Sequence, residues 1–161
     1  MTAWRIRTIS RILRWMKVVA QNRRARYDYE ILDTVEAGII LTGQEVKSCR
    51  GGHMNLAGSY VSLLSGKPVL KNAAIAPYMF AGHMADYDPG QDRTLLLNKS
   101  QVAKIQAQLD EKGVSLVPLE VRAGKHIKVL LGLAKGRKRL DKRQAIKERD
   151  IKKKLRKGQE Y

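Results

Sequence analysis

Residues 114–133 read VSLVPLEVRAGKHIKVLLGL. Two apolar runs, 114–122 and 125–133, flank the pair Ala123-Gly124, and this pattern predicts two strands joined by a short turn. Further toward the N-terminus, residues 58–75 contain two β-rich runs around Ser65-Gly66-Lys67, which predicts a second hairpin. Residues 27–41 predict one or two more strands, with a bulge or bend near Gly38.

Two helices are expected between these strands. Thr42 followed three residues later by Glu45 is a capping box, so a short helix is expected to begin there and to end at Gly51-Gly52. Asn98 with Gln101 is a second box, and an apolar stripe at helical spacing extends the predicted helix toward Gly113. At least five strands and two helices predict a mainly β protein, a small antiparallel barrel of the oligonucleotide-binding kind with appended helices.

The charge of the chain is concentrated at its two ends. Its 161 residues carry 32 Lys and Arg against 15 Asp and Glu, a formal net charge of +17. Residues 1–26 hold eight basic and no acidic side chains, residues 27–134 are neutral, and residues 135–157 carry thirteen basic against three acidic side chains. Charge needed only for solubility is smaller, about 2 to 8, and scattered. The clusters therefore predict a polyanionic partner, either a nucleic acid or an anionic membrane surface.

Several classes of protein are excluded or unsupported. No run approaches the roughly 18 to 20 apolar residues of a membrane span. The single cysteine, Cys49, cannot form an internal disulfide and favours a reducing, cytoplasmic location. His53, His83 and His126 are scattered without zinc spacing, and no phosphate-cradling glycine loop or nucleophile elbow occurs. We expect no metal, no cofactor and no catalytic activity.

The chain divides into three predicted parts. Residues 1–21 form a basic amphipathic extension, residues 22–134 a β-barrel domain, and residues 135–161 a basic tail. The extension also has the composition of an organelle transit peptide, and Met16 is an alternative start of translation that would leave residues 1–15 outside the native protein. The tail is too poor in apolar residues to pack, so we expect it to fold only on a polyanion.

An ordered series of motifs resembles the small protein B family, the bacterial SsrA-binding proteins. The motifs cover about four fifths of the chain and are Asn22-Arg23-Arg24-Ala25-Arg26, Glu36-Ala37-Gly38, Leu41 to Ser48, Asn55-Leu56, Ser59-Tyr60-Val61, Asp88-Pro89, Leu95-Leu96-Leu97-Asn98, Val117-Pro118-Leu119, Lys128-Val129, Gly132 to Gly136 and Asp141-Lys142-Arg143. The resemblance implies a monomeric RNA-binding protein of trans-translation. Such a protein binds the tRNA-like domain of transfer-messenger RNA and delivers it to stalled ribosomes.

The resemblance also implies partners and site residues. The tail would become helical in the empty messenger channel beside the decoding centre, and elongation factor Tu and alanyl-tRNA synthetase would be met through the charged RNA. The expected RNA-binding residues are Asn22, Arg23, Arg24, Arg26, Glu36, Lys47, Leu96, Lys128 and Lys135. The expected ribosome-binding residues of the tail are Lys138, Arg139, Leu140, Asp141, Lys142 and Arg143.

The residue types suggest different roles within this set. Arginine suits phosphate, whereas Glu36 could accept hydrogen bonds from base or ribose donors, hold an arginine, or be a structural turn carboxylate. Leu96 could contact RNA or pack in the core. Leu140 stands where the family usually has His or an aromatic residue, which removes ring stacking, and Gln91 and Thr94 replace usual basic residues.

Two competing functions remain open at this level. A structural ribosomal or ribosome-assembly protein would show the same charge and fold. The other possibility is a membrane-associated protein, and only residues 1–20 support that interpretation.

Overall fold

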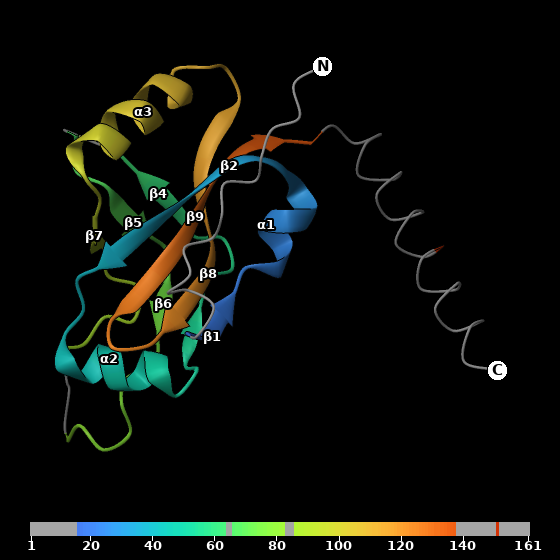
Figure 1. Cartoon of the computed structure of the whole chain (residues 1–161). Coiled ribbons are helices and arrows are strands. Elements are labelled where there is room, and N and C mark those ends of the chain that lie inside the picture. Colours follow the sequence, from blue (N-terminus) through green and yellow to red (C-terminus); the bar gives the residue numbers. More distant parts are fainter. Residues whose placement is uncertain (1–15, 64–65, 83–85, 138–150, 152–161) are drawn as a thin grey trace.

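The computed structural model describes residues 16–63, 66–82, 86–137 and 151, in which β-strands are the main regular structure and three helices lie around them (Figure 1). In chain order the elements are β1 (Lys17–Gln21), α1 (Arg23–Asp28), β2 (Tyr29–Ile39), α2 (Gly43–Arg50), β3 (Met54–Asn55), β4 (Tyr60–Ser62), β5 (Val69–Lys71), β6 (Ala74–Ile75), β7 (Arg93–Leu96), α3 (Lys99–Leu109), β8 (Val114–Ala123) and β9 (Ile127–Gly136). The expectation of a mainly β fold with appended helices is confirmed.

Antiparallel pairing links seven of the strands into one sheet. The order is β1-β8-β4-β5-β7-β2-β9, and β8 also pairs with β9. The longest pairings are those of β9 with β2 and with β8, each extending over most of the strand. The two predicted hairpins, β4–β5 and β8–β9, are both present.

The sheet buries apolar side chains on both of its faces along β8 and β9. Val121, Val129, Leu131 and Leu133 belong to the main core, whereas Leu119, Leu130 and Ala134 pack with Ala25 of α1 on the opposite face. Strands that are buried on both faces read as continuous apolar runs, which explains why 114–133 lacks strict alternation.

β2 is a single strand, and its irregularity is not at Gly38. The register shifts between Ile31 and Asp33, so Ile31 faces the cluster under α1 while Val35 and Ala37 face the main core. A one-residue bulge exchanges the two faces of a strand, and here it lets β2 serve both clusters. The predicted interruption near Gly38 is therefore wrong in position.

The two capping boxes are confirmed. Thr42 and Glu45 exchange the side-chain to backbone hydrogen bonds of a capping box at α2, and that helix is capped at Gly51. Asn98 and Gln101 form the box of α3, which ends at Leu109, earlier than the predicted Gly113. Cys49 lies buried in α2, and burial raises the pKa of its thiol to about 11.

The N-terminal segment differs most from expectation. Lys17–Gln21 forms β1, paired with β8, and Ala20 reaches the main core, so the predicted helical amphipathic pattern is wrong for this segment. α1 follows at once and was not expected. Its first turn is capped by Asn22, whose side chain accepts a hydrogen bond from the Ala25 N–H. Residues 1–15 lie outside the described residues.

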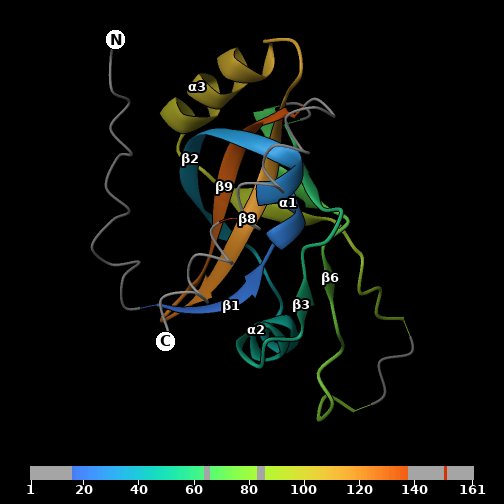
Figure 2. The same ribbon diagram turned by 90° about the vertical axis from the view of Figure 1, so that its right-hand side faces the viewer.

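Residues 76–92 form a long loop between β6 and β7, of which residues 83–85 are not described. Figure 2 shows this loop extending from the end of the molecule at which α2 lies. None of the described helices has the length and apolar composition needed to span a lipid bilayer.

Candidate nucleic-acid interface

Strand register brings three of the predicted RNA-binding residues onto one face of the sheet. Gly38 of β2 lies directly opposite Leu96 of β7 on one side and Lys128 of β9 on the other. Lys128 in turn is opposite Arg122 of β8. The neighbouring row contains Glu36, Leu130 and Glu120. We call this surface of β7, β2, β9 and β8 the outer face, because the alternate side chains of these strands point into the main core.

Glu36 and Lys128 interact across the outer face. The Lys128 Nζ lies 3.5 Å from Glu36 Oε1, and the two side chains are 38% and 26% exposed for Lys128 and Glu36 respectively. An ion pair this accessible is worth little to stability, because water screens it. Both groups therefore stay available to a ligand, the carboxylate as an acceptor and the ammonium as a donor.

Glu120 is a buried carboxylate that forms ion pairs with two arginines at the edge of the outer face. Its side chain is 6% exposed, and Arg122 Nε donates to its Oε1 at 2.7 Å. Arg26 Nη2 of α1 lies 3.6 Å from Oε2, and the Arg26 side chain is 58% exposed. A buried carboxylate with two guanidinium partners leaves one positive charge in excess, directed toward solvent by Arg26.

Leu96 is an exposed apolar side chain in a row of three leucines. It is 56% exposed, whereas Leu95 is 2% exposed and Leu97 packs at the edge of the core. The alternative that Leu96 serves core packing is therefore wrong. A Cβ atom at Gly38 would lie 3.2 Å from the Leu96 Cβ, so glycine at position 38 leaves Leu96 its place on the outer face.

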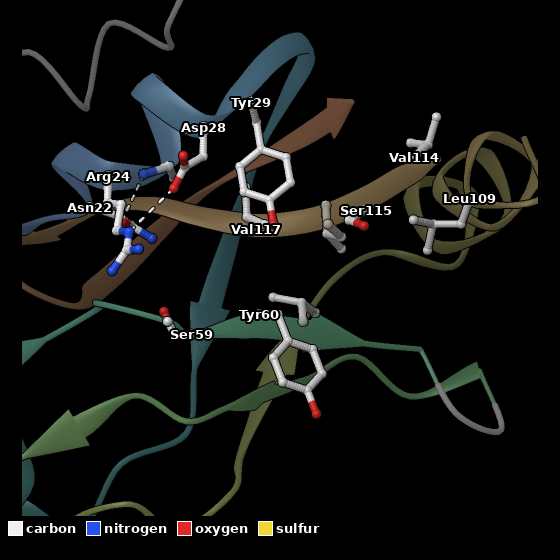
Figure 3. A pocket seen from close by; sticks show the side chains of 14 residues that line it. Asn22, Arg24, Asp28, Tyr29, Ser59, Tyr60, Leu109, Val114, Ser115 and Val117 are labelled. Atoms are coloured by element: carbon white, nitrogen blue, oxygen red, sulfur yellow. Dashed lines mark hydrogen bonds and ion pairs between the residues drawn. The ribbon is translucent and has the colours of Figure 1, made fainter. Parts of the chain in front are cut away.

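Arg24 faces a second surface, a groove between α1, β4 and the start of β8. The groove has a volume of about 640 Å³, and Figure 3 shows Tyr29 and Tyr60 on its opposite sides with Ser115 and Val117 of β8 between them. Arg24 Nε is 3.3 Å from Asp28 Oδ2 at one end. The structure thus separates Arg24 from Arg26, although both lie on the same helix.

The Asn22 side chain forms hydrogen bonds within the protein. Its side chain is buried, accepts from the Ala25 N–H at 3.0 Å and donates to the Pro118 carbonyl at 3.1 Å. These contacts fix α1, and with it the arginines of that helix, against β8. Arg23 is exposed on the same helix.

Lys47 and Lys135 lie away from the outer face. Lys47 is exposed on α2, with its Nζ 5.4 Å from the centre of the Tyr78 ring. Lys135 is exposed on β9, paired with Glu30 and Val114. It lies seven residues after Lys128, about 23 Å along a strand. Lys138, Arg139, Leu140, Asp141, Lys142 and Arg143 lie outside the described residues, as does the predicted tail helix.

Most of the chain closely resembles known proteins. Residues 19–160 match the family model described as SmpB protein. The SsrA-binding protein of Coprothermobacter proteolyticus is 48% identical over 143 residues, which are 88% of this chain and 95% of that protein. The chain belongs to the SmpB family.

Other SmpB relatives give the same result. The SsrA-binding protein of Staphylococcus aureus strain Newman is 48% identical over 136 residues, 83% of this chain and 87% of its own length. A chain of the solved structure described as "tmRNA-SmpB: a journey to the center of the bacterial ribosome" is 43% identical and superposes with a TM-score of 0.63. The match covers 81% of this chain and 94% of that one.

Two residues of the outer face were missed by the sequence analysis. Glu120 and Arg122 alternate on β8, but a lone carboxylate within an apolar strand gives no local sign of its partners. Arg26, the other partner of Glu120, is 94 residues earlier in the chain. The alternation of charged Glu120 and Arg122 with apolar Val121 was the one available signal that their side chains share a face.

Proposed function

We propose that this protein binds the tRNA-like domain of transfer-messenger RNA through the outer face and brings that RNA to ribosomes stalled in translation. One observation carries the proposal. Glu36, Leu96 and Lys128 come from three distant parts of the sequence, and strand register places them side by side. The names of the SmpB relatives, SsrA-binding proteins and a tmRNA-SmpB complex of the ribosome, identify the RNA and the particle.

The chemistry of the outer face suits folded RNA. Arg26 and Lys128 can meet phosphates, Glu36 can accept a hydrogen bond from a base or ribose donor, and Leu96 offers an apolar surface. Phosphate contacts position the RNA, and the carboxylate adds selectivity, because a negative charge repels phosphate and is tolerated only opposite a donor. We propose no catalytic role for any of these residues.

We further infer that the paired strands close into a small barrel of the oligonucleotide-binding kind. The pairings lead from β8 through β4, β5, β7, β2 and β9 and return to β8, which supports closure. We propose that the RNA-binding domain includes β1 and extends through β9, and that the basic tail after it enters the messenger channel of the small subunit.

The remaining partners follow from the same proposal. A charged transfer-messenger RNA would bring elongation factor Tu and alanyl-tRNA synthetase to the protein without a direct contact. The protein would act as a cytoplasmic monomer, since one outer face per tRNA-like domain is sufficient.

Affinity purification of the full chain followed by sequencing of the bound RNA tests the proposed function. We expect one dominant tRNA-like RNA, and we expect the double variant Glu36→Lys, Lys128→Glu to lose it while keeping its circular dichroism melt. A broad mixture of ribosomal RNA, with the protein present on every ribosome in equal amount, would instead identify a structural ribosomal or assembly protein.

A further inference from the structure

The loop between β6 and β7 presents two large apolar side chains to solvent beside a half-buried tyrosine. Met79 is 87% exposed and Phe80 is 79% exposed, the two highest values for large apolar side chains among the described residues. Tyr78 precedes them, and its ring lies 5.5 Å from that of Phe80 in an edge-to-face arrangement. A turn closed by the hydrogen bond from the Ala81 N–H to the Tyr78 carbonyl holds the three residues together. We call Tyr78, Met79 and Phe80 the aromatic tip.

Both limbs of this loop are fixed to the body of the protein. On the first limb, Ser48 Oγ donates to the Ala76 carbonyl at 2.6 Å, and the Ala76 N–H donates to the His53 carbonyl at 3.0 Å. On the second limb, Arg93 Nη2 donates to the Pro89 carbonyl at 2.9 Å, and Tyr87 Oη donates to the Ile75 carbonyl at 3.0 Å.

A buried ion pair is the centre of these tethers. Glu45 Oε1 accepts from Arg93 Nε and from Gln91 Nε2, both at 2.9 Å, and the Glu45 and Arg93 side chains are almost fully buried. Such a network costs desolvation and stabilises one geometry of the loop limbs. These contacts hold the described parts of both limbs against the body of the protein.

The surroundings of the aromatic tip are basic on the side of α2. Lys47 Nζ lies 5.4 Å from the centre of the Tyr78 ring. Lys47 and Arg50 occupy the last turn of α2, both exposed. Arg50 also donates to the Gly124 and Lys125 carbonyls. The acidic residues of the loop lie on its second limb, where Asp88 Oδ1 accepts from the Gly90 N–H, and Asp86 is exposed.

We propose that the aromatic tip is a second RNA contact, at which an unpaired base stacks on Phe80 while Lys47 meets the adjacent phosphate. Exposed aromatic rings beside a cation are the means by which proteins hold unpaired bases without reading their sequence. The positive charge on α2 complements a phosphate, which an apolar protein partner would not need. The proposal rests on the proposed function only in taking RNA as the partner, and it places this contact outside the outer face.

Variants of Phe80 test the stacking. The probe is a fluorescent oligoadenylate of about ten nucleotides, titrated with the full chain at high salt, where the phosphate attraction of the basic termini is weakened. Phe80→Ala and Phe80→Leu should each weaken binding about tenfold, because both lack a ring, and Phe80→Trp should bind like the parent. Lys47→Gln should reduce the log-log salt slope by about 0.7.

Three results would contradict the proposed contact between RNA and the aromatic tip or the function on which it rests. Phe80→Leu keeps most of the apolar area, so a variant that binds oligoadenylate like the parent would overturn the stacking proposal. Loss of flotation with phosphatidylglycerol vesicles in Phe80→Ala, with RNA binding unchanged, would overturn it in favour of a membrane. Failure of the parent to prefer the tRNA-like domain over another RNA of equal length would instead contradict the proposed function.

Discussion

Arg93 and Glu45 form a buried ion pair that joins β7 to α2. Arg93 Nε and Nη2 lie 2.9 Å and 2.8 Å from the same oxygen, Glu45 Oε1, and the side chains of Arg93 and Glu45 are 2% and 3% exposed. The same guanidinium donates to the Ala73 and Gln91 carbonyls through Nη1. One side chain thus connects β7 to α2 and to the loop before it.

Removal of Arg93 should destabilise the fold strongly. Arg93→Ala leaves the Glu45 carboxylate buried without its charged partner, and we expect a loss of about 3 to 5 kcal/mol in the free energy of unfolding, measured by urea titration. Lys71→Ala is the matched control, since it breaks an ion pair with Asp92 that is open to water, and it should change the midpoint little. Equal midpoints for the two variants would contradict a structural role for the pair.

Stability should fall at acid pH partly through Glu45. Burial by itself raises the pKa of this carboxyl, but the Thr42 N–H, Gln91 and Arg93 together outweigh it and hold the pKa below its ordinary value. A lowered carboxyl pKa contributes stability above the unfolded value, about 4.3, and that contribution is lost as the pH falls through the folded value. Urea midpoints measured downward from pH 5 should therefore fall less steeply in Glu45→Gln than in the parent. Identical slopes would show that the carboxyl is not held ionised.

Adjacent leucines should separate folding from binding. Leu95→Ala empties part of the core and should cost about 2 to 5 kcal/mol of stability. Leu96→Ala removes an exposed side chain, so the melting curve should stay near that of the parent while the affinity for the tRNA-like domain falls by about 1 kcal/mol. Filter binding and circular dichroism on the same preparations give both values. An unchanged affinity in Leu96→Ala would remove this residue from the interface.

The elements that were predicted correctly are those with local signals. The signals for the capping boxes at Thr42 and Asn98 and for the two hairpins each lie within a few residues of sequence, and both boxes and both strand pairings are present. The sequence analysis did not predict α1, because this helix has only six residues and buries only Ala25, which is too few for a helical apolar period. β1 was not predicted either. Its strand conformation depends on pairing with β8, about a hundred residues later, whereas the arginine-rich sequence around it favours a helix.

The outer face shows the same limit. Glu36, Leu96 and Lys128 could be singled out from motifs, but their adjacency depends on the register of β2 with β7 and β9. The burial of Glu120 could not be expected, since the two arginines that compensate it come from α1 and from β8. Tertiary pairing decides which charges meet, and a single sequence does not contain that information locally.

Glu36 should contribute to RNA binding independently of Lys128. Glu36→Gln removes an ionised acceptor and should cost about 1 to 3 kcal/mol of affinity for the tRNA-like domain, with little effect on the thermal melt. Lys128→Gln tests whether Glu36 only holds the lysine in place. Because the ion pair between them is exposed and weak, the two losses should add in a double-mutant cycle to within about 1 kcal/mol. If Glu36→Gln has no effect once Lys128 is replaced, the carboxylate serves to position the lysine and does not contact the RNA.

The end of the sheet marks where the basic tail can be removed. β9 ends at Gly136, and the Arg137 N–H still donates to the Asp28 carbonyl at 3.1 Å. Truncation after Arg137 therefore keeps every described contact of the sheet. We expect the truncated protein to melt like the parent and to bind the tRNA-like domain almost as well, while peptide tagging on stalled ribosomes is lost.

A helix-breaking substitution should show whether the tail acts as a helix or as a flexible cation. Asp141 with Gln144 predicts a helix start, and neutralisation of the thirteen basic residues of 135–157 by phosphates would allow it to form. Ile151→Pro leaves the charge unchanged and costs about 3 kcal/mol in a helix, whereas Ile151→Ala leaves both charge and helix intact.

We expect both variants to keep the parent's non-specific RNA affinity, with a log-log salt slope of about −4 to −7. Tagging in a reconstituted translation assay should fail with Ile151→Pro and persist with Ile151→Ala. Normal tagging by the proline variant would mean that the tail works as an extended tether, because only the helix has been removed.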